Sequence, residues 1–485
     1  MGILLGSQEL VVVVERSAWV PADFVEHLRG AIPGFDQESQ KDQLWLARFA
    51  WVGHSKARQH KGFKEFMSVS HRELESVFGR GKFEPLNKRL NFLHVAPYWS
   101  KANASTKGYA FARRVSEARV AYFAALPSSP TNLVLSDGST LRKLPPAVAS
   151  KDMDGLTTTA WKSAKAMNRI PVNVAALHEF RGFLEVCLDE CIAGTAPPEW
   201  SGQYAAGRFR ELLAASGQVL RMANTAAAGP GFVPQHYVQA RSGRLYGQGF
   251  TLQSVPTPVR HAAMAGWYEY DISNCHYSIV SQMARKHGFC CPAIDAYLLD
   301  KDGFRRRVAA QVGITVDQAK QCLLAILYGA RRNPSEHNSI PQEIGSERAR
   351  SFYDMAEVAT LFTELQGARR AILRNWTRSG NARLVNDFGR AVDPKQTPEQ
   401  QLAHLTQGVE ARALLTCVNL APSQIVLLQH DGFVSTSPLN MDELTNRICD
   451  ATGYRFSMEE VHIAAPMGRT KSNLISLLRQ DPWGL

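Results

Sequence analysis

Two aspartates in the second half of the chain stand in strand-like patterns. Asp271 lies in the alternating segment 266–273, GWYEYDIS, and Asp431 lies at the Asp-Gly turn of 424–436, QIVLLQHDGFVST. A third strand-like segment, 459–466, follows near the C-terminus. Hard divalent cations prefer oxygen ligands, so two carboxylates at one sheet edge can hold a pair of cations that catalyse phosphoryl transfer. Half-exposed aspartates at turns are also common, so this pattern alone leaves both interpretations open.

A helical pattern between the two aspartates adds a cation and an aromatic ring. In 316–332, VDQAKQCLLAILYGARR, Lys320, Leu324 and Tyr328 are spaced four residues apart and share one face. A lysine there is suited to a triphosphate, and a ring is suited to stacking on a base. An ordinary amphipathic helix with a solvent-exposed lysine explains Lys320 and Leu324, but it does not explain the Tyr-Gly ending.

Five short segments occur in a fixed order between residues 240 and 465. They are Ser242-Gly243-Arg244-Leu245 with Leu252-Gln253-Ser254-Val255-Pro256, then Asp271-Ile272-Ser273, then Lys320 with Tyr328-Gly329, then Thr406-Gln407-Gly408, and finally His430-Asp431. In this order they resemble the TGRLS…LQNIP segment, motif A, motif B, the MQGT helix and motif C of the family A DNA polymerases. The phage-type single-subunit RNA polymerases are more distant relatives of that family. The resemblance covers about half of the chain.

The resemblance implies a role for each matched residue. It implies two Mg²⁺ ions, with Mn²⁺ as a substitute, bound by Asp271, Asp431 and the backbone carbonyl of Ile272. It implies that Lys320 contacts the incoming triphosphate and protonates the leaving pyrophosphate. The nucleotide-binding residues would be Lys320, Tyr328, His276, Leu324 and Arg307, and the primer- and template-binding residues would be Arg244, Gln253, Gln407 and His430.

Several positions depart from the family pattern. His276 stands where the family has the glutamate that crowds the 2′-hydroxyl of a ribonucleotide, which leaves sugar selection open. Leu324 replaces an aromatic residue, and Gly432 replaces the motif C glutamate. Val316 stands at the position of a phosphate-binding arginine, for which a residue of Arg305-Arg306-Arg307 is the expected replacement.

The resemblance also implies the architecture, an α+β right-hand polymerase with an antiparallel palm sheet. The domains expected from it are an N-terminal DNA-binding domain at 1–145, a helical thumb at 146–240, palm at 241–288 and 400–485, and fingers at 289–399. Nothing before Arg244 resembles a proofreading exonuclease.

The N-terminal domain contains the outline of a winged helix. Two short helical patterns in 66–95 precede a basic, glycine-containing hairpin pattern, giving a winged-helix-like core at about 66–120. Its phosphate-facing residues would be Lys88, Arg89, Lys101, Lys107, Arg113 and Arg114. An ordinary solvent-exposed helical pair is the alternative.

The composition agrees with a globular protein that binds a polyanion. The chain has 485 residues, 45% of them hydrophobic, and a formal net charge of +11, so several domains and a nucleic-acid partner are expected. Its eight cysteines form no CxxC pair, which argues against a zinc finger and fits a reducing compartment. The apolar N-terminal stretch 1–16 is expected to form a strand, and no apolar run reaches membrane-spanning length. The expected location is cytoplasmic, without a membrane partner.

These observations favour a template-directed DNA polymerase that replicates a plasmid, phage or mobile element. Its partners would be template and primer DNA, nucleoside triphosphates and other replication proteins. One alternative is a primase or single-subunit RNA polymerase that uses ribonucleotides. Another is a DNA-binding replication initiator whose polymerase body has lost catalysis, although both aspartates, Lys320 and Tyr328 are present.

Overall fold

A computed structural model of the chain describes most of its residues. These are residues 19–52, 59–60, 63–95, 106–125, 131–135, 140–141, 158–198, 203–225, 227–248, 250–376, 378–379, 383–429, 431–468 and 477–478. The strand expected within 1–16, residue Lys101 and residue His430 lie outside them.

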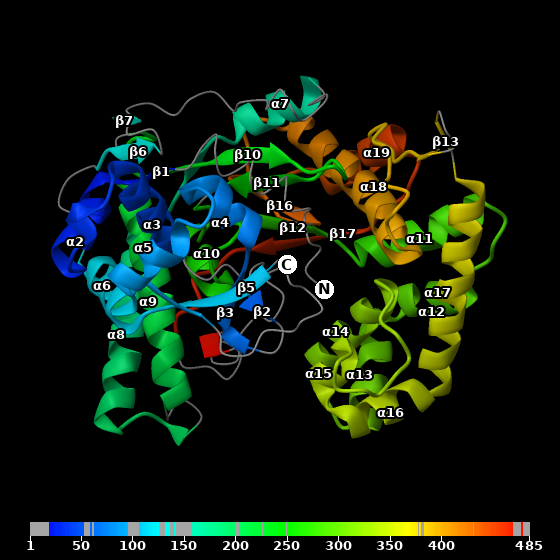
Figure 1. Ribbon diagram of the computed structural model, residues 1–485. Helices are drawn as coiled ribbons and strands as arrows, with labels where there is room; N and C mark the ends of the chain where they lie inside the picture. The colour runs from blue at the N-terminus through cyan, green and yellow to red at the C-terminus, as the bar shows by residue number, and fades with distance from the viewer. Residues whose placement is uncertain are drawn as a thin grey trace.

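A four-stranded antiparallel sheet stands at the centre of the molecule (Figure 1). Its strand order is β15-β16-β12-β17, with β12 at Tyr268–Ile272, β15 at Ile425–Leu428, β16 at Gly432–Ser435 and β17 at Met458–His462. The strands expected at 266–273, 424–436 and 459–466 are therefore confirmed. Because side chains alternate along a strand, Tyr270 and Ile272 face one core while Glu269 and Asp271 face the other side.

Helices α11 (Cys275–Lys286), α18 (Pro398–Leu420) and α19 (Met441–Thr452) pack around the face that carries Tyr270. A capping box of Thr397 and Gln400 starts α18. The helix is buried on nearly every side from Leu402 to Val418, which suits its apolar sequence.

A group of helices follows α11 on one side of the sheet (Figure 1). Its members are α12 (Pro292–Leu299), α13 (Lys301–Val312), α14 (Val316–Leu327), α15 (Ser339–Ile344), α16 (Ser346–Asp354) and α17 (Ala356–Asn375), followed by the hairpin of β13 (Arg378–Ser379) and β14 (Arg383–Leu384). The helix expected over 316–332 ends earlier, at Leu327. Gly329 has a φ of 86°, which is incompatible with a continuing α-helix. Tyr328 is therefore the C-cap of α14.

Two long helices, α8 (Val174–Ala193) and α9 (Gln203–Ala223), pack together on the opposite side of the sheet (Figure 1). Shorter elements connect them to the centre. These are α7 (Thr158–Ala166), β8 (Arg169–Pro171), β9 (Phe232–Pro234), the β10–β11 hairpin (His236–Gln239 and Leu245–Gln248) and α10 (Thr257–Ala263).

The N-terminal part contains two further sheets. One has the order β2-β3-β5-β4, with β2 at Gln59–His60, β3 at Phe63–Ser70, β4 at Leu93–Val95 and β5 at Thr106–Phe111. The other joins β1 (Trp19–Pro21), β6 (Leu133–Leu135) and β7 (Thr140–Leu141). The helices of this part are α2 (Ala22–Ala31), η1 (Phe35–Gln37), α3 (Gln40–Val52), α4 (His71–Phe78), α5 (Phe83–Leu90) and α6 (Arg113–Ala124).

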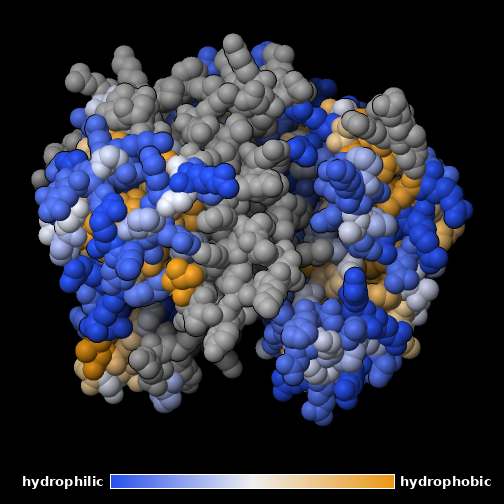
Figure 2. Space-filling model, viewed as in Figure 1, coloured by the Kyte–Doolittle hydropathy of each residue, from blue (hydrophilic) through white to orange (hydrophobic). Residues whose placement is uncertain are grey.

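The described residues form a mixed fold of helices and small antiparallel sheets, as expected for the α+β class. In Figure 2 the visible face over α13, α15 and α16 is mostly hydrophilic. Among the helices described, none combines the length and the apolar character needed to cross a membrane.

Candidate active site

Asp271 and Asp431 come together on two paired strands of the central sheet. Asp271 of β12 lies opposite Gly432 of β16, and the N–H of Ile272 donates to the carbonyl of Asp431 at 2.9 Å. A Cβ at position 432 would collide with the Tyr270 carbonyl and with Oδ1 of Asp271. The Asp271 carboxylate therefore lies against position 432, and the lack of a side chain at Gly432 makes room for it.

The two carboxyls disfavour one another's ionisation. Desolvation by the surrounding protein and the charge of Asp431 raise the pKa of Asp271 to about 7. Burial, and then the charge of Glu410, raise the pKa of Asp431. A bound cation would favour the ionised form of both groups, so the donor set suits hard divalent cations.

Lys320 of helix α14 is a positive group that acts on Asp271. Its side chain is exposed, and its charge lowers the pKa of Asp271 against the effect of desolvation. Leu324 is half-buried one turn later and packs against the core formed by the second half of the chain. Lys320 therefore lies within electrostatic reach of the Asp271 carboxylate.

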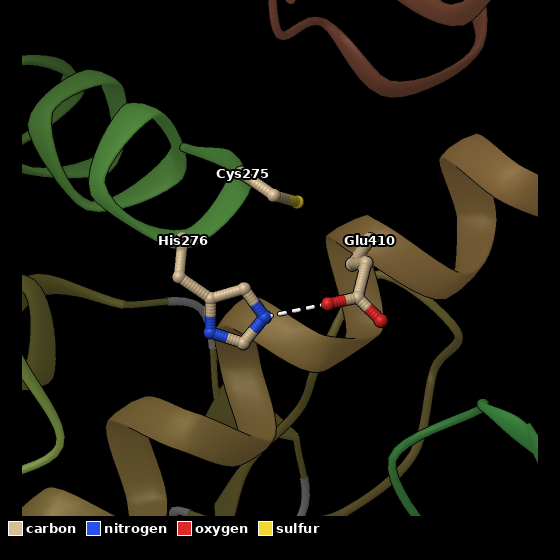
Figure 3. Close-up of side chains that lie close together, drawn as sticks. All are labelled: Cys275, His276 and Glu410. Atoms are coloured by element: carbon tan, nitrogen blue, oxygen red, sulfur yellow. Dashed lines mark hydrogen bonds and ion pairs between the residues drawn. The ribbon is translucent and has the colours of Figure 1, made fainter. Parts of the chain in front are cut away.

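A network of four side chains, two of them buried and two half-buried, adjoins the carboxylates. His276 Nε2 lies 2.6 Å from Glu410 Oε2, and Figure 3 shows the His276 ring on α11 facing Glu410 on α18. The Tyr328 hydroxyl lies 2.6 Å from His276 Nδ1. Arg244 donates to both Glu410 oxygens, from Nε at 2.6 Å and from Nη2 at 2.5 Å. The charges of His276 and Arg244 lower the pKa of Asp431, so the network and the carboxylates interact.

The donors in this network follow from its chemistry. Arg244 and His276 lower the pKa of Glu410 although its burial acts the other way, so Glu410 is ionised and accepts. The Nε2 of His276 therefore carries a hydrogen. Burial raises the pKa of Tyr328, so its hydroxyl stays protonated beside the Nδ1 of His276.

Cys275, His276 and Glu410 also form a group with ligand-type atoms within 4.8 Å of one another (Figure 3), the one such group among the residues described. Burial raises the pKa of the Cys275 thiol well above its usual value. Both Glu410 oxygens accept from Arg244. A protonated thiol and an arginine-bound carboxylate are poor metal ligands, and His276 and Glu410 instead hydrogen-bond to each other.

The structure places two of the residues expected to bind primer and template, Gln253 and Gln407. Gln253 accepts from the Gly247 N–H at 2.6 Å and donates to the Leu428 carbonyl at 2.7 Å, so its amide joins β11 to the end of β15. Gln407 is buried in α18, close to Glu410 in sequence. His430 lies outside the described residues.

Two of the three consecutive arginines of α13, Arg305 and Arg307, differ in their surroundings. Arg307 pairs with Asp300 at 3.0 Å and with Glu357 at 3.3 Å on the surface. Arg305 instead donates to Asn274 Oδ1 at 2.7 Å, in the loop that follows β12. Arg305 is therefore the one of the two that contacts the segment next to Asp271.

Two carboxylates near the site were not singled out by sequence patterns. Glu410 is the one acidic residue in the buried stretch of α18 from 402 to 418, one turn after Gln407, and that isolation is the signal that points to it. Glu459 lies opposite Asp271 in the β12–β17 pair and forms an ion pair with Lys301. Its position depends on strand order, which the sequence does not reveal.

Comparisons with known proteins find similarity among solved structures. No family model matches the chain, and no curated protein matches it. Among solved structures, the chain is similar to the POL domain of Pol1 from M. smegmatis, determined in complex with a DNA primer-template and a dNTP. The identity is 15% and the TM-score 0.41, over 62% of this chain and 68% of that chain.

Proposed function

We propose that this protein is a template-directed nucleotidyltransferase, a DNA polymerase of the family A type. The observation that carries the proposal is the proximity of Asp271 and Asp431 where β12 pairs with β16, with Lys320 within electrostatic reach of Asp271. Two carboxylates and a lysine are the groups that phosphoryl transfer from a nucleoside triphosphate needs. The excess of Lys and Arg in the chain supports a nucleic-acid substrate.

Asp271 and Asp431, with the backbone carbonyl of Ile272, would hold two Mg²⁺ ions, and Mn²⁺ would substitute. When bound, such ions stabilise the charge on the entering and leaving oxygens of phosphoryl transfer. Lys320 binds the triphosphate and supplies a proton to the pyrophosphate that leaves. Tyr328 and Leu324, farther along the same helix, line the nucleotide pocket.

The arrangement of elements supports a right-hand division of the chain. The sheet of β12, β15, β16 and β17 serves as palm, the helices from α12 to α17 as fingers, and α8 with α9 as thumb. In the N-terminal part, the order α3, β3, α4, α5, β4, β5 and the pairing of β3 with β5 and β5 with β4 support a winged helix. That module would bind the DNA of a plasmid, phage or mobile element during its replication.

Ribonucleotide polymerisation, as by a primase, is the second candidate. The observation that favours it is His276, which replaces a glutamate at the position that crowds a 2′-hydroxyl. A DNA-binding initiator without catalysis is a third candidate, which the pairing of Asp271 with Asp431 disfavours.

An extension assay on a single-stranded template separates these functions. It compares dNTPs with NTPs, each with and without an annealed primer, in Mg²⁺. Primer extension by dNTPs that Asp271→Ala abolishes supports a DNA polymerase, whereas primer-free products from NTPs support a primase. No incorporation under any condition, with DNA binding retained, would overturn the proposal and leave a DNA-binding protein.

A further inference from the structure

The turn between β12 and α11 has an unusual backbone conformation. It consists of Ser273 and Asn274 and follows directly after the strand that carries Asp271. Asn274 has a φ of 45°, in the left-handed region, which among the non-glycine residues described only Asn91 shares. A side chain makes this region unfavourable, although asparagine tolerates it better than most residues do. The conformation therefore persists only where surrounding contacts stabilise it.

The Asn274 side chain is bound by two residues from other helices. An asparagine that precedes a helix usually accepts from N–H groups of the first turn, but Asn274 makes no such bond to α11. Its Oδ1 instead accepts from Nη2 of Arg305 at 2.7 Å and from the Tyr297 hydroxyl at 3.3 Å. Arg305 also donates to the Tyr297 hydroxyl, from Nε at 3.1 Å and from Nη2 at 2.8 Å. Since the Arg305 side chain is only 13% exposed and Tyr297 is buried, these bonds are shielded from water.

Lys301 contacts the other residue of the turn. It lies one helical turn before Arg305 on α13, so the two side chains share a face of that helix. Its Nζ donates to Ser273 Oγ at 2.9 Å and pairs with Glu459, which lies opposite Asp271 on β17. Helix α13 therefore contacts both residues of the turn that follows the strand of Asp271.

We infer that Arg305 is a positioning residue of the proposed active site, acting through Asn274 on the placement of Asp271. The inference rests on the proposed function. Asp271 lies three residues before Asn274, near the end of β12, so a turn that relaxes also displaces this end of the strand. Because Nε and Nη2 of Arg305 already donate to Tyr297 and Asn274, Arg305 does not serve as the arginine that binds the triphosphate.

The test separates kcat from KM for a dNTP in primer extension. Arg305→Met retains an unbranched side chain but cannot donate, so Asn274 and Tyr297 lose a partner and the turn can leave its left-handed conformation. We expect kcat to fall about tenfold while KM for the dNTP changes by less than about twofold. An arginine that binds the triphosphate would instead raise KM, and that result would overturn the inference.

A second measurement does not depend on incorporation. If Asp271 is displaced in Arg305→Met, then Mg²⁺ at pH 8 should raise the melting temperature of this variant less than that of the wild type. A folded Arg305→Met that matches the wild type both in kcat and in the rise caused by Mg²⁺ would overturn the inference and leave the proposed function standing. Wild-type protein that incorporates no nucleotide would overturn both together.

Substitutions of Asn274 test the same contact from the side of the turn. Asn274→Asp keeps an acceptor for Arg305 and tolerates the left-handed region, so it should retain a kcat close to that of the wild type. Asn274→Gly adopts that region readily but has no acceptor, so its kcat should fall as in Arg305→Met. Full activity of Asn274→Gly would overturn the inference, because the bond to Arg305 would then be dispensable. This variant also serves where Arg305→Met does not fold.

Arg285→Met is the matched control for loss of an arginine that joins two helices. Arg285 of α11 donates to Asp295 of α12 at 2.7 Å, and both side chains are partly exposed. This variant should leave kcat and the rise caused by Mg²⁺ unchanged. Equal losses of kcat in Arg285→Met and Arg305→Met would overturn the inference, because the loss of any arginine between helices would explain them.

Discussion

At the scale of single residues, the site contains two kinds of carboxylate. Asp271 and Asp431 disfavour one another's ionisation, whereas Glu410 is stabilised in its ionised form by Arg244 and His276. The first kind still needs a cation, and the second already has one in Arg244. This difference supports the proposal that the aspartate pair binds metal while Glu410 has a supporting role.

Asp271→Asn tests the repulsion between the aspartates. The pKa of Asp271 is raised from 3.8 to about 7, so between these values the folded protein binds more protons than the unfolded chain. Its stability therefore falls as pH rises through that window, provided that no cation is bound. In EDTA, Asp271→Asn should melt above the wild type at pH 8 and close to it at pH 4. Mg²⁺ at pH 8 should raise the wild-type melting temperature more than that of the variant, and an equal rise would count against metal binding at Asp271.

His236 and His404 predict a loss of stability in acid. Burial lowers the pKa of each from 6.5 to about 4, and within the described part of the chain the Nε2 of each has no hydrogen-bond partner. The unfolded chain binds more protons below pH 6.5, so stability is lost as pH falls from 6.5 towards 4, by up to about 1.4 kcal/mol per pH unit for each histidine. His404→Leu should reduce this slope in urea unfolding measured at several pH values. An unchanged slope would show that His404 does not contribute.

At the scale of elements, the contact between β12 and β16 depends on Gly432. A methyl group there would meet the Tyr270 carbonyl and the Asp271 carboxylate, so Gly432→Ala should cost about 1–3 kcal/mol of unfolding free energy and abolish incorporation. The matched control is Gly207→Ala in α9, where a Cβ meets nothing within 4 Å. That change should stabilise the helix by about 1 kcal/mol in urea unfolding and leave activity intact. Similar stability and activity in both variants would contradict the close approach at Gly432.

The sequence predicts the strands of the central sheet well because their signals are local. Alternation marks β12, and the Asp-Gly turn marks the β15–β16 hairpin. The pairing of β12 with β17 is set by tertiary packing between segments far apart in the chain. This pairing places Glu459 opposite Asp271. The same holds for the network, since Arg244, His276, Tyr328 and Glu410 come from four separate segments.

At the scale of the whole molecule, the central sheet lies between two groups of helices, and the N-terminal elements lie beside α8 and α9 (Figure 1). The cores divide accordingly, one around the N-terminal elements and α8 to α10, and one around α11 to α19. Both cores include residues of the central sheet, for example Val434 in the first and Phe433 in the second. Hydrophobic residues therefore pack against both faces of the sheet that carries the aspartates.

The N-terminal part is expected to bind DNA through phosphate contacts, and salt dependence tests this. Lys88 at the end of α5 and Arg114 at the start of α6 are both exposed. Because each phosphate contact releases a counterion, Lys88→Ala or Arg114→Ala should weaken duplex binding and reduce the slope of log Kd against log salt by about 1. Lys41→Ala, which removes an exposed lysine of α3 outside the expected contact set, is the matched control and should leave the slope unchanged. Equal slopes for all three variants, measured by fluorescence anisotropy from low to moderate salt, would show that the DNA-binding surface lies elsewhere in the molecule.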